Sequence, residues 1–429
     1  MTNKKLKLKN TFILFLLLAV ILSGCSKEKA KIGDENFEKA LIHMDLDDEV
    51  DGYIVISDKI KEMTFLNLNN EGIKQLNGIE FFTELLKLDI RNNQLSSLDI
   101  SRNPKLYKIN ATNNQLTSID VGKNSDLLEL EVGGNQLSSL DISRNPKLQK
   151  LYVWRNKLTS IDVGKNSDLS VLEVGGNQLS SLDISRNPKL QKLYISRNKL
   201  SDLNLSSNFN LQILDAESNQ LTSINLDKNA ELLKLFVKNN QLPSLDISSN
   251  HKLEELDASF NTLTSIRTNE NTELIELIVS FNQLTYLNFS TSPKLQKIKA
   301  TSNQLNKIFV NRNSELLELA VDDNQLSTLD VSENSKLQKL YVWRNKLTYL
   351  DIFHNPELDS LWGDSTILNY SGLHTFLAIN KLKTSAESIN SLAKSINSLI
   401  DDTNDIIKWI LGIFVFLIIA KIISKLAEQ

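Results

Sequence analysis

A leucine recurs every 21 residues from Leu85 to Leu358, without one shift in register. The interval defines 13 complete units, and each of them carries asparagine at its ninth position and leucine at its eleventh. One unit of this size cannot bury its own apolar positions, so consecutive units must stack on one another. The sequence therefore predicts a repeat solenoid.

The spacing of apolar residues within a unit predicts its local structure. The first, fourth, sixth and eleventh positions are apolar and are expected to face the interior. The first half of each unit alternates apolar and polar residues, which predicts a strand, and stacked units then form a parallel sheet. The second half, for example Leu98-Asp99-Ile100, also alternates. We expect a second, short outer strand there and little helix.

Asparagine also fills the nineteenth position of 12 of the 13 units, and Ser292 is the exception. An amide side chain both donates and accepts hydrogen bonds, so it can satisfy backbone groups at turns. Both asparagine rows are therefore predicted to be structural ladders and not binding sites.

The unit that begins at Leu148 reads LQKLYVWRNKLTSIDVGKNSD and contains the leucine-rich-repeat pattern L-x-x-L-x-L-x-x-N-x-L. The array resembles bacterial surface leucine-rich-repeat lipoproteins of the internalin-like kind, which carry runs such as Asn-Gln-Leu-Ser-Ser-Leu-Asp at 135–141. Residues 36–42 and Asp51-Gly52 resemble the cap that precedes the repeats in that family. Many members carry cysteine at the sixth position, where this chain has Val, Ile or Ala.

This resemblance extends over about residues 34–365. It implies an α/β-class horseshoe that is mostly β, with the parallel sheet on its concave side. It also implies protein binding and adhesion as a function, without a common enzymatic activity.

The chain is predicted to contain seven segments. They are a signal peptide (1–24), a linker and N-terminal cap (25–62), a repeat array with an irregular first coil of 22 residues and 13 regular repeats (63–357), a C-terminal cap (358–380), a helical stalk (381–405), a transmembrane helix (406–423) and a cytoplasmic tail (424–429).

The N-terminal segment has the features of a lipoprotein signal peptide. Four lysines precede an apolar run, Phe12–Leu22, that is too short to span a membrane. The run ends in Leu22-Ser23-Gly24-Cys25, which resembles the bacterial lipoprotein cleavage motif, and Cys25 is the one cysteine of the chain. In that family the cysteine thiol receives the lipid. Cys25 is therefore predicted to be lipidated, and an exported protein of the cell envelope is expected.

The apolar run Ile406–Ile423 has 18 residues, enough to cross a bilayer as a helix of about 27 Å. Aspartates precede the run and lysines follow it, so the positive-inside rule places the repeats outside the cytoplasm. Apolar residues between 389 and 406 recur at spacings of three and four, which is typical of a helical stripe. Self-association through 389–406 and simple packing of a stalk are both left open.

Composition excludes several classes of function. The net charge is −4, which argues against nucleic-acid binding. One cysteine and four histidines leave little material for metal or acid–base sites. The sequence has no Gly-rich phosphate loop and no H-E-x-x-H motif. No enzyme activity, cofactor or metal site is predicted.

The sheet exposes the third, fifth, seventh and eighth positions of each unit. The residues that determine which partner binds are expected at these positions. Lysine and glutamate share the third position and are expected to compensate one another across strands. Aromatic residues and arginine anchor protein interfaces. The candidate partner-binding residues are Tyr152, Trp154, Arg155, Tyr194, Phe236, Tyr341, Trp343, Arg344 and Trp362.

A shallow pocket is predicted around Tyr152, Trp154 and Arg155. Glycine pairs at 133–134 and 175–176 flank them in the neighbouring repeats and leave space beside the indole. An aromatic ladder stacked on its neighbours is the alternative, as is copying by duplication, because residues 132–152 recur at 174–194.

The sequence thus predicts an exported, membrane-anchored protein that binds a protein partner through its concave face. Two alternatives stay open. One is a glycan-binding surface protein, since tyrosine and tryptophan beside open space suit sugar rings. The other is a structural spacer or tether of the cell envelope, held by the lipid at Cys25 and the helix 406–423.

Overall fold

A computed structural model of the chain describes residues 29–268 and 271–363. The chain divides into two compact units, Met1–Glu273 and Leu274–Gln429. In both units the 21-residue repeats form successive coils, and each coil contributes one strand to a parallel sheet. The prediction of a mostly β repeat solenoid is therefore confirmed within each unit.

Several predicted segments lie outside the described residues. They are the signal peptide 1–24, Cys25, the stalk 381–405 with the stripe 389–406, the transmembrane helix 406–423 and the tail 424–429. Within 29–268 and 271–363, no helix has the length and apolar character needed to cross a bilayer.

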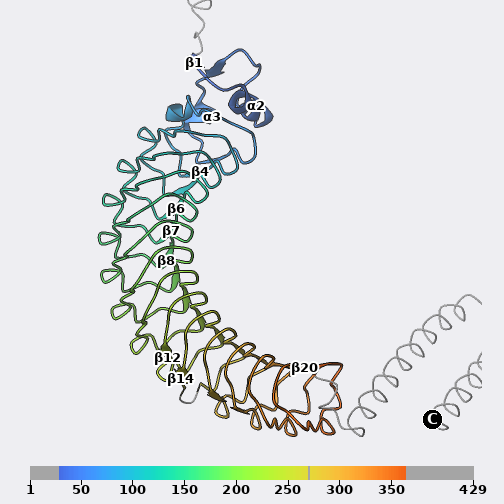
Figure 1. The fold of residues 1–429 in the computed structure, drawn as a ribbon. Coiled ribbons are helices and arrows are strands. Elements are labelled where there is room, and N and C mark those ends of the chain that lie inside the picture. The colour runs from blue at the N-terminus through green and yellow to red at the C-terminus, as the bar shows by residue number, and fades with distance from the viewer. Residues whose placement is uncertain (1–28, 269–270, 364–429) are drawn as a thin grey trace, which may run out of the picture. The chain divides into compact units, whose positions relative to one another are not determined.

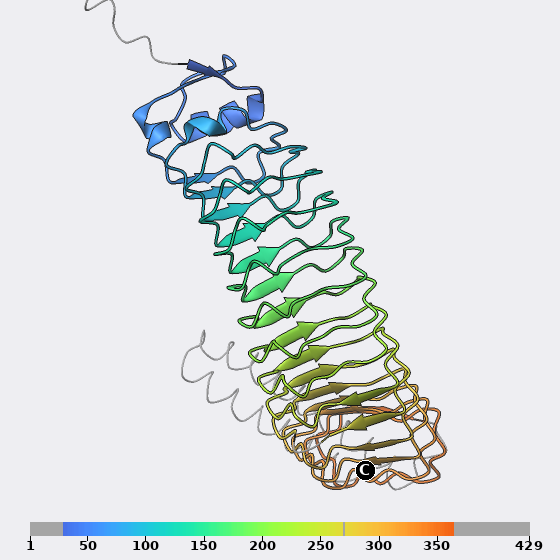
Figure 2. The ribbon, with the colours of Figure 1, turned by 90° about the vertical axis from the view of Figure 1, so that its left-hand side faces the viewer.

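The main sheet of the first unit contains ten parallel strands in chain order, each beside the strand of the preceding coil (Figures 1 and 2). They are β3 (Phe65–Asn67), β4 (Lys87–Asp89), β5 (Lys108–Asn110), β6 (Glu129–Glu131), β7 (Lys150–Tyr152), β8 (Val171–Glu173), β9 (Lys192–Tyr194), β10 (Ile213–Asp215), β11 (Lys234–Phe236) and β13 (Glu255–Asp257).

Equivalent positions of neighbouring repeats lie side by side in this sheet. Tyr152, for example, is in register with Glu131 on one side and with Glu173 on the other. The pairing of Phe65 with Lys87 spans 22 residues, as the irregular first coil requires. A pattern that repeats every 21 residues in the sequence therefore becomes a straight row across the strands.

The second unit repeats this arrangement with β15 (Glu276–Ile278), β17 (Lys297–Lys299), β19 (Glu318–Ala320), β20 (Lys339–Tyr341) and β21 (Ser360–Trp362). Strand β21 lies in the segment predicted to begin the C-terminal cap. The sheet of this unit therefore continues to Trp362.

Short outer strands form in four of the described coils. In the first unit β12 (Ser244–Asp246) pairs with β14 (Ser265–Arg267), and in the second unit β16 (Tyr286–Asn288) pairs with β18 (Lys307–Phe309). Elsewhere in the described coils this half of the repeat has turns and backbone without regular secondary structure. The predicted outer strand is thus confirmed for part of the array.

A small cap covers the first coil of the first unit (Figure 1). The Asp34 carboxylate caps a helix with one oxygen and accepts hydrogen bonds from the backbone N–H groups of Lys74 and Gln75 with the other. It therefore joins the cap to the repeats. The cap and first coil contain β1 (Lys29–Lys31), α2 (Glu35–His43), β2 (Tyr53–Val55), α3 (Asp58–Lys61) and the 3-10 helix η1 (Ile79–Phe81).

The core is a stack of aliphatic layers, one for each coil. In the coil of β7, Leu148, Leu151, Val153 and Leu158 occupy the first, fourth, sixth and eleventh positions, and all four are fully buried. Burial of a side chain of this size stabilises the fold by about 1.5–3 kcal/mol. The predicted inward positions are therefore confirmed.

The asparagine at position nine links each coil to its neighbours. The Asn156 side chain accepts a hydrogen bond from the backbone N–H of Leu137 (2.9 Å) and donates to the carbonyls of Val132 (3.0 Å) and Val153 (3.1 Å). The buried N–H of Leu137 has this oxygen as its acceptor, and each of the two carbonyls also accepts from a neighbouring asparagine, Asn135 or Asn177. The same contacts recur along the array, so this row is a structural ladder, as predicted.

The asparagine at position nineteen makes fewer hydrogen bonds. The amide nitrogen of Asn145 donates to the carbonyls of Val121 (2.9 Å) and Asn124 (2.8 Å), but its side-chain oxygen is buried without a hydrogen-bond partner. Burying an oxygen without a partner costs free energy, which offsets part of the gain. The second ladder therefore stabilises the stack less than the first.

The residue at position eight turns the chain at the end of every main strand. It has a positive φ in all 13 repeats, in the left-handed region that favours glycine. The residues are Asn92, Asn113, Gly134, Arg155, Gly176, Arg197, Ser218, Asn239, Phe260, Phe281, Ser302, Asp323 and Arg344.

We predict that Asn156→Ala lowers the free energy of unfolding by about 3 kcal/mol, and Asn145→Ala by about 2 kcal/mol. The first change leaves the buried N–H of Leu137 without its acceptor and removes one of the two amide donors to each of the carbonyls of Val132 and Val153, whereas the second removes donors alone. Urea unfolding of the two variants checks the order. Equal losses would show that the two ladders contribute alike.

Candidate functional site

The third position of the exposed face of the main sheet carries paired charges. In the first unit Lys108 lies 2.7 Å from Glu129 and Lys234 lies 2.6 Å from Glu255. In the second unit Lys297 lies 2.7 Å from Glu276. The predicted compensation of lysine and glutamate across strands is therefore confirmed at these positions.

The fifth position is different, because carboxylates and aromatic rings alternate over seven consecutive strands of the first unit. Strand pairing puts each ring between two carboxylates. We call this row the acidic–aromatic stripe. It consists of Glu131, Tyr152, Glu173, Tyr194, Asp215, Phe236 and Asp257, from β6 to β13.

Few of these carboxylates have a cationic partner. Glu131 shares Lys108 with Glu129, at 3.0 Å. Asp215 and Asp257 accept hydrogen bonds from the backbone N–H groups two residues later. Glu173 is half-buried, and its carboxylate makes no hydrogen bond or ion pair within the part of the chain that the structure describes.

The pKa values of Glu173 and Glu217 on this face are raised. Burial raises the pKa of Glu173, and the negative charges of Asp215 and Glu131 raise it further. Burial also raises the pKa of Glu217 at the seventh position, where Asp215 and Asp257 add to the shift while Lys238 and Arg197 oppose it. Perturbed carboxyl groups of this kind are common at functional sites.

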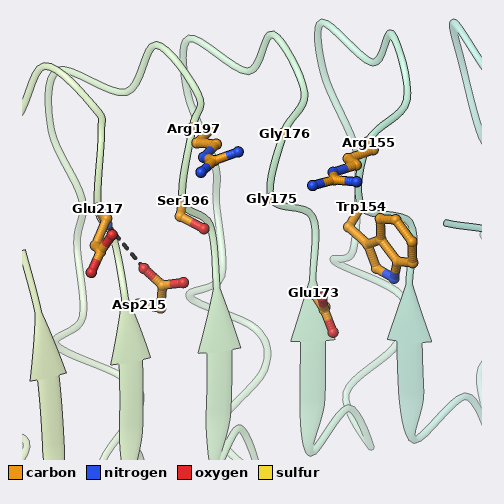
Figure 3. A pocket seen from close by; sticks show the side chains of 9 residues that line it. All are labelled: Trp154, Arg155, Glu173, Gly175, Gly176, Ser196, Arg197, Asp215 and Glu217. Carbon is orange, nitrogen blue, oxygen red and sulfur yellow. Dashed lines mark hydrogen bonds between the residues drawn. The ribbon is translucent and has the colours of Figure 1, made fainter. Parts of the chain in front are cut away.

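A pocket opens over strands β7 to β10 beside this stripe, with a volume of about 540 Å³ (Figure 3). Trp154 forms one end, and Glu217 stands at the other. Arg155 and Arg197 point toward one another past Gly176, above the carboxylate of Glu173. The lining residues are Trp154, Arg155, Glu173, Gly175, Gly176, Ser196, Arg197, Asp215 and Glu217.

Two glycines at equivalent positions have different neighbours. A Cβ at Gly133 would lie 2.4 Å from Cε2 of the Trp154 indole, so the indole rests directly on this glycine. A Cβ at Gly175 would meet Ser196 at 3.2 Å, without touching the indole. The following glycines, Gly134 and Gly176, occupy the position that needs a positive φ. The indole thus occupies the space above Gly133, and Gly175 and Gly176 line the open pocket on its other side.

The structure distributes the predicted residues of the first unit over two neighbouring features. Trp154 and Arg155 line the pocket, and the guanidinium lies 5.8 Å from the indole ring centre. Tyr152, expected in the pocket, lies instead in the acidic–aromatic stripe with Tyr194 and Phe236. Sequence reasoning missed Glu173, Ser196, Arg197, Asp215 and Glu217. The 42-residue alternation of the fifth position could have revealed Glu173 and Asp215.

The predicted residues of the second unit form their own cluster. The rings of Tyr341 and Trp362 stack at 4.4 Å, with 3° between their planes. The Arg344 guanidinium lies 4.4 Å from the ring of Trp343 and 3.3 Å from the Asp323 carboxylate. Asp322 and Asp323 stand one repeat before Trp343, at the positions that the glycine pair 133–134 occupies before Trp154, and Trp343 is 48% exposed.

The aspartates at position fifteen of the repeat, on the outer side, accept hydrogen bonds within their own turns. Asp183, for example, accepts hydrogen bonds from the side chain and from the backbone N–H of Ser185, which hold the pKa of Asp183 below its usual value. Among the described residues, no group of three or more His, Cys, Asp or Glu side chains could hold a metal ion.

Comparison with protein families identifies a leucine-rich repeat at residues 146–200. The functional domain of InlJ from Listeria monocytogenes has a similar structure, with a TM-score of 0.76 and 29% identity, over 82% of this chain and 80% of that domain. It includes a cysteine ladder. Valine, isoleucine or alanine fills the sixth position here. Comparison with curated protein sequences gives no match.

Two further structures share the fold. The internalin InlF of Listeria monocytogenes has a TM-score of 0.63 and 22% identity, over 79% of this chain and 98% of that one. The ectodomain of the receptor kinase GASSHO1/SCHENGEN3 from Arabidopsis thaliana has a TM-score of 0.58 and 21% identity, over 75% and 47%. The matched repeat family and the two Listeria structures indicate no enzyme family.

We predict that Gly133→Ala displaces the Trp154 indole into solvent. A methyl group at that position costs about 1 kcal/mol or more unless the ring moves. Acrylamide quenching of Trp154 fluorescence should therefore rise, measured in a background with Phe at 343, 362 and 409. Gly175→Ala is the matched control and should leave quenching unchanged. A similar rise in both variants would contradict the close packing of the indole on Gly133.

We predict that Glu173→Gln stabilises the protein at pH 7, by less than about 1 kcal/mol because solvent screens a half-exposed group. The folded-state pKa of Glu173 is raised, so the fold favours the neutral carboxyl. This contribution is complete below the unfolded-state pKa and is lost as the pH rises through the folded-state pKa. The gain of the variant should therefore vanish at pH 4.

Urea unfolding at pH 7 and pH 4 measures this difference. Asp183→Asn is the control with the opposite sign, since the pKa of Asp183 is lowered in the fold. A Glu173→Gln variant that is less stable than the parent at pH 7 would indicate that the carboxylate has a stabilising partner.

Proposed function

We propose that this chain is an exported, membrane-anchored leucine-rich-repeat protein that binds a protein partner through the exposed face of the main sheet. The observation that carries the proposal is the pocket over β7 to β10. There an indole, two arginines and several carboxylates meet, and neither arginine forms an ion pair within the described residues.

A purely structural role does not account for this arrangement. Elsewhere on the same face charges pair across strands, at 2.6–2.7 Å for Lys108–Glu129 and Lys234–Glu255. In the pocket, Arg155, Arg197 and Glu173 keep their charges without such pairs. Leaving the half-buried carboxylate of Glu173 unpaired costs free energy, and a cationic group of a partner would recover it, while the exposed Arg155 and Arg197 can pair with carboxylates of that partner.

Trp154 provides the apolar part of the proposed site. Tryptophan and arginine are enriched among the residues that dominate binding energy, especially where the surroundings exclude water. The indole is half-buried and fixed on Gly133, so binding would cost little side-chain entropy.

The comparisons support an interaction module. Internalin-like proteins are associated with protein binding and adhesion, and InlJ shares 29% identity with this chain. The GASSHO1/SCHENGEN3 ectodomain was solved in complex with CASPARIAN STRIP INTEGRITY FACTOR 2. At 21% identity that likeness is one of fold alone.

The proposed location rests on the ends of the sequence. A lipid on Cys25 and a helix over 406–423 would hold the protein at the cell envelope, with the repeats outside the cytoplasm. Internalin-like surface proteins present their repeats in the same compartment.

Glycan binding is the second candidate, favoured by the half-buried indole of Trp154 beside an open pocket. Sugar rings stack on such a surface but carry no cation for Glu173, Asp215 and Glu217. The protein partner accounts for both the indole and the charges, so it is preferred.

Affinity capture with the full-length protein tests the proposal, using extracts of the cell envelope and of neighbouring cells. Trp154→Ala should weaken retention of a bound protein by about thirtyfold, the effect of losing an interface anchor of about 2 kcal/mol. Phe209→Ala is the control, because Phe209 is 53% exposed and lies outside the main strands.

Each outcome has a defined meaning. A protein held by the parent and by Phe209→Ala but lost by Trp154→Ala supports the proposal. Equal retention by all three proteins would move the interface away from the pocket. Retention of polysaccharide in place of protein would favour the glycan alternative.

A further inference from the structure

We propose that the acidic–aromatic stripe docks an extended segment of the partner that carries a lysine or arginine at every third residue. The segment would lie across strands β6 to β13, with its cationic side chains on the stripe. This inference rests on the proposed function and names the chemistry of the partner.

The stripe holds the carboxylates of Glu131, Glu173, Asp215 and Asp257 at the fifth position. The third position beside it is mixed in charge, since Lys150 lies 3.5 Å from Glu129 and Lys234 lies 2.6 Å from Glu255. On β7 and β9, Arg155 and Arg197 at the eighth position and Lys192 at the third flank the stripe. The stripe therefore attracts cations, and these three basic side chains repel a cation placed beside it on those two strands.

The rings between the carboxylates suit the same ligand. Tyr152, Tyr194 and Phe236 are half-buried and fixed in register between acidic neighbours. A cation over the face of an aromatic ring gains about 0.5–2 kcal/mol, and a nearby carboxylate adds an ion pair. An ammonium or guanidinium group on the stripe can make both contacts at once.

The spacing of the stripe selects a conformation of the ligand. Successive carboxylates are two strands apart, which is about 9.6 Å in a parallel sheet. A polyproline II helix has three residues per turn and rises about 3.1 Å per residue, so every third side chain points the same way at intervals of about 9.3 Å. Four such side chains would match the four carboxylates.

The two arginines beside the stripe suit the backbone of this ligand. A polyproline II helix makes no internal hydrogen bonds, so its carbonyl groups need outside donors. Arg155 and Arg197 form no ion pair within the described residues and point into the pocket beside the stripe (Figure 3). Their guanidinium groups can donate to these carbonyls, and Trp154 offers the aromatic wall on which proline rings pack.

Two synthetic peptides of identical composition test the proposal. One is the triplet Lys-Pro-Pro repeated four times. The other is Lys-Pro repeated four times and followed by four prolines, which breaks the three-residue spacing. Binding to the full-length protein is measured by calorimetry at low and at physiological salt. The triplet peptide should bind at least about tenfold more tightly than its isomer.

Variants locate the binding surface. The double variant Glu173→Gln, Asp215→Asn should weaken binding of the triplet peptide by about tenfold, as two lost ion pairs predict. The matched control is Asp141→Asn, Asp183→Asn, which removes the same charge from exposed outer turns. Asparagine can still accept the turn hydrogen bond, so the control should fold and bind as the parent does.

Three results would overturn the inference. They are equal affinity for both peptides, equal weakening by the two double variants, and no binding of the triplet peptide. Capture of a protein partner that depends on Trp154 would stand in each case, so the proposed function and this inference fail separately.

Discussion

The hydrogen bonds of the asparagine at position nine are the constraint on which this structure depends. Each side chain joins backbone groups of its own coil to those of neighbouring coils, as Asn156 does with Val132, Leu137 and Val153. A coil that shifted by one residue would lose these bonds and expose its aliphatic layer. The ladder therefore keeps the repeats in phase, and equivalent residues of neighbouring strands stay in line.

This alignment separates the stability of the protein from its recognition chemistry. The ladders and the aliphatic layers occupy the inward positions, so the third, fifth, seventh and eighth positions can vary without loss of the core. At the third position charges compensate one another, whereas at the fifth position of the first unit they do not. The difference between the two rows, and not the charge of the face as a whole, marks the candidate site.

The fold could be predicted from the sequence because its determinants are periodic and local. The leucines, the asparagine rows and the 22-residue first coil all have the positions that the spacing required. The site was predicted less completely. Trp154 and Arg155 were found by residue type, but Glu173 and Asp215 are ordinary acids until pairing across strands places them beside rings. Their lack of cationic partners depends on side-chain directions, which a repeat pattern does not specify.

The glycines show the same limit. Gly133 supports an indole, while Gly134 and Gly176 satisfy a backbone angle that every repeat adopts at position eight. In the sequence the glycine pairs at 133–134 and 175–176 are identical, so their different roles could not be distinguished. Arg155 and Arg197 adopt the same positive φ, so the backbone that ends each strand also fixes where these guanidinium groups begin.

The alternation of the stripe has a period of two repeats, and this limits how such an array can change in length. Residues 132–152 recur at 174–194, a displacement of 42 residues. Insertion or loss of a pair of repeats keeps each ring between two acids. A single repeat gained or lost would place two rings, or two acids, on adjacent strands. The unit that preserves the pattern of this surface is therefore a pair of coils, although the structural repeat is a single coil.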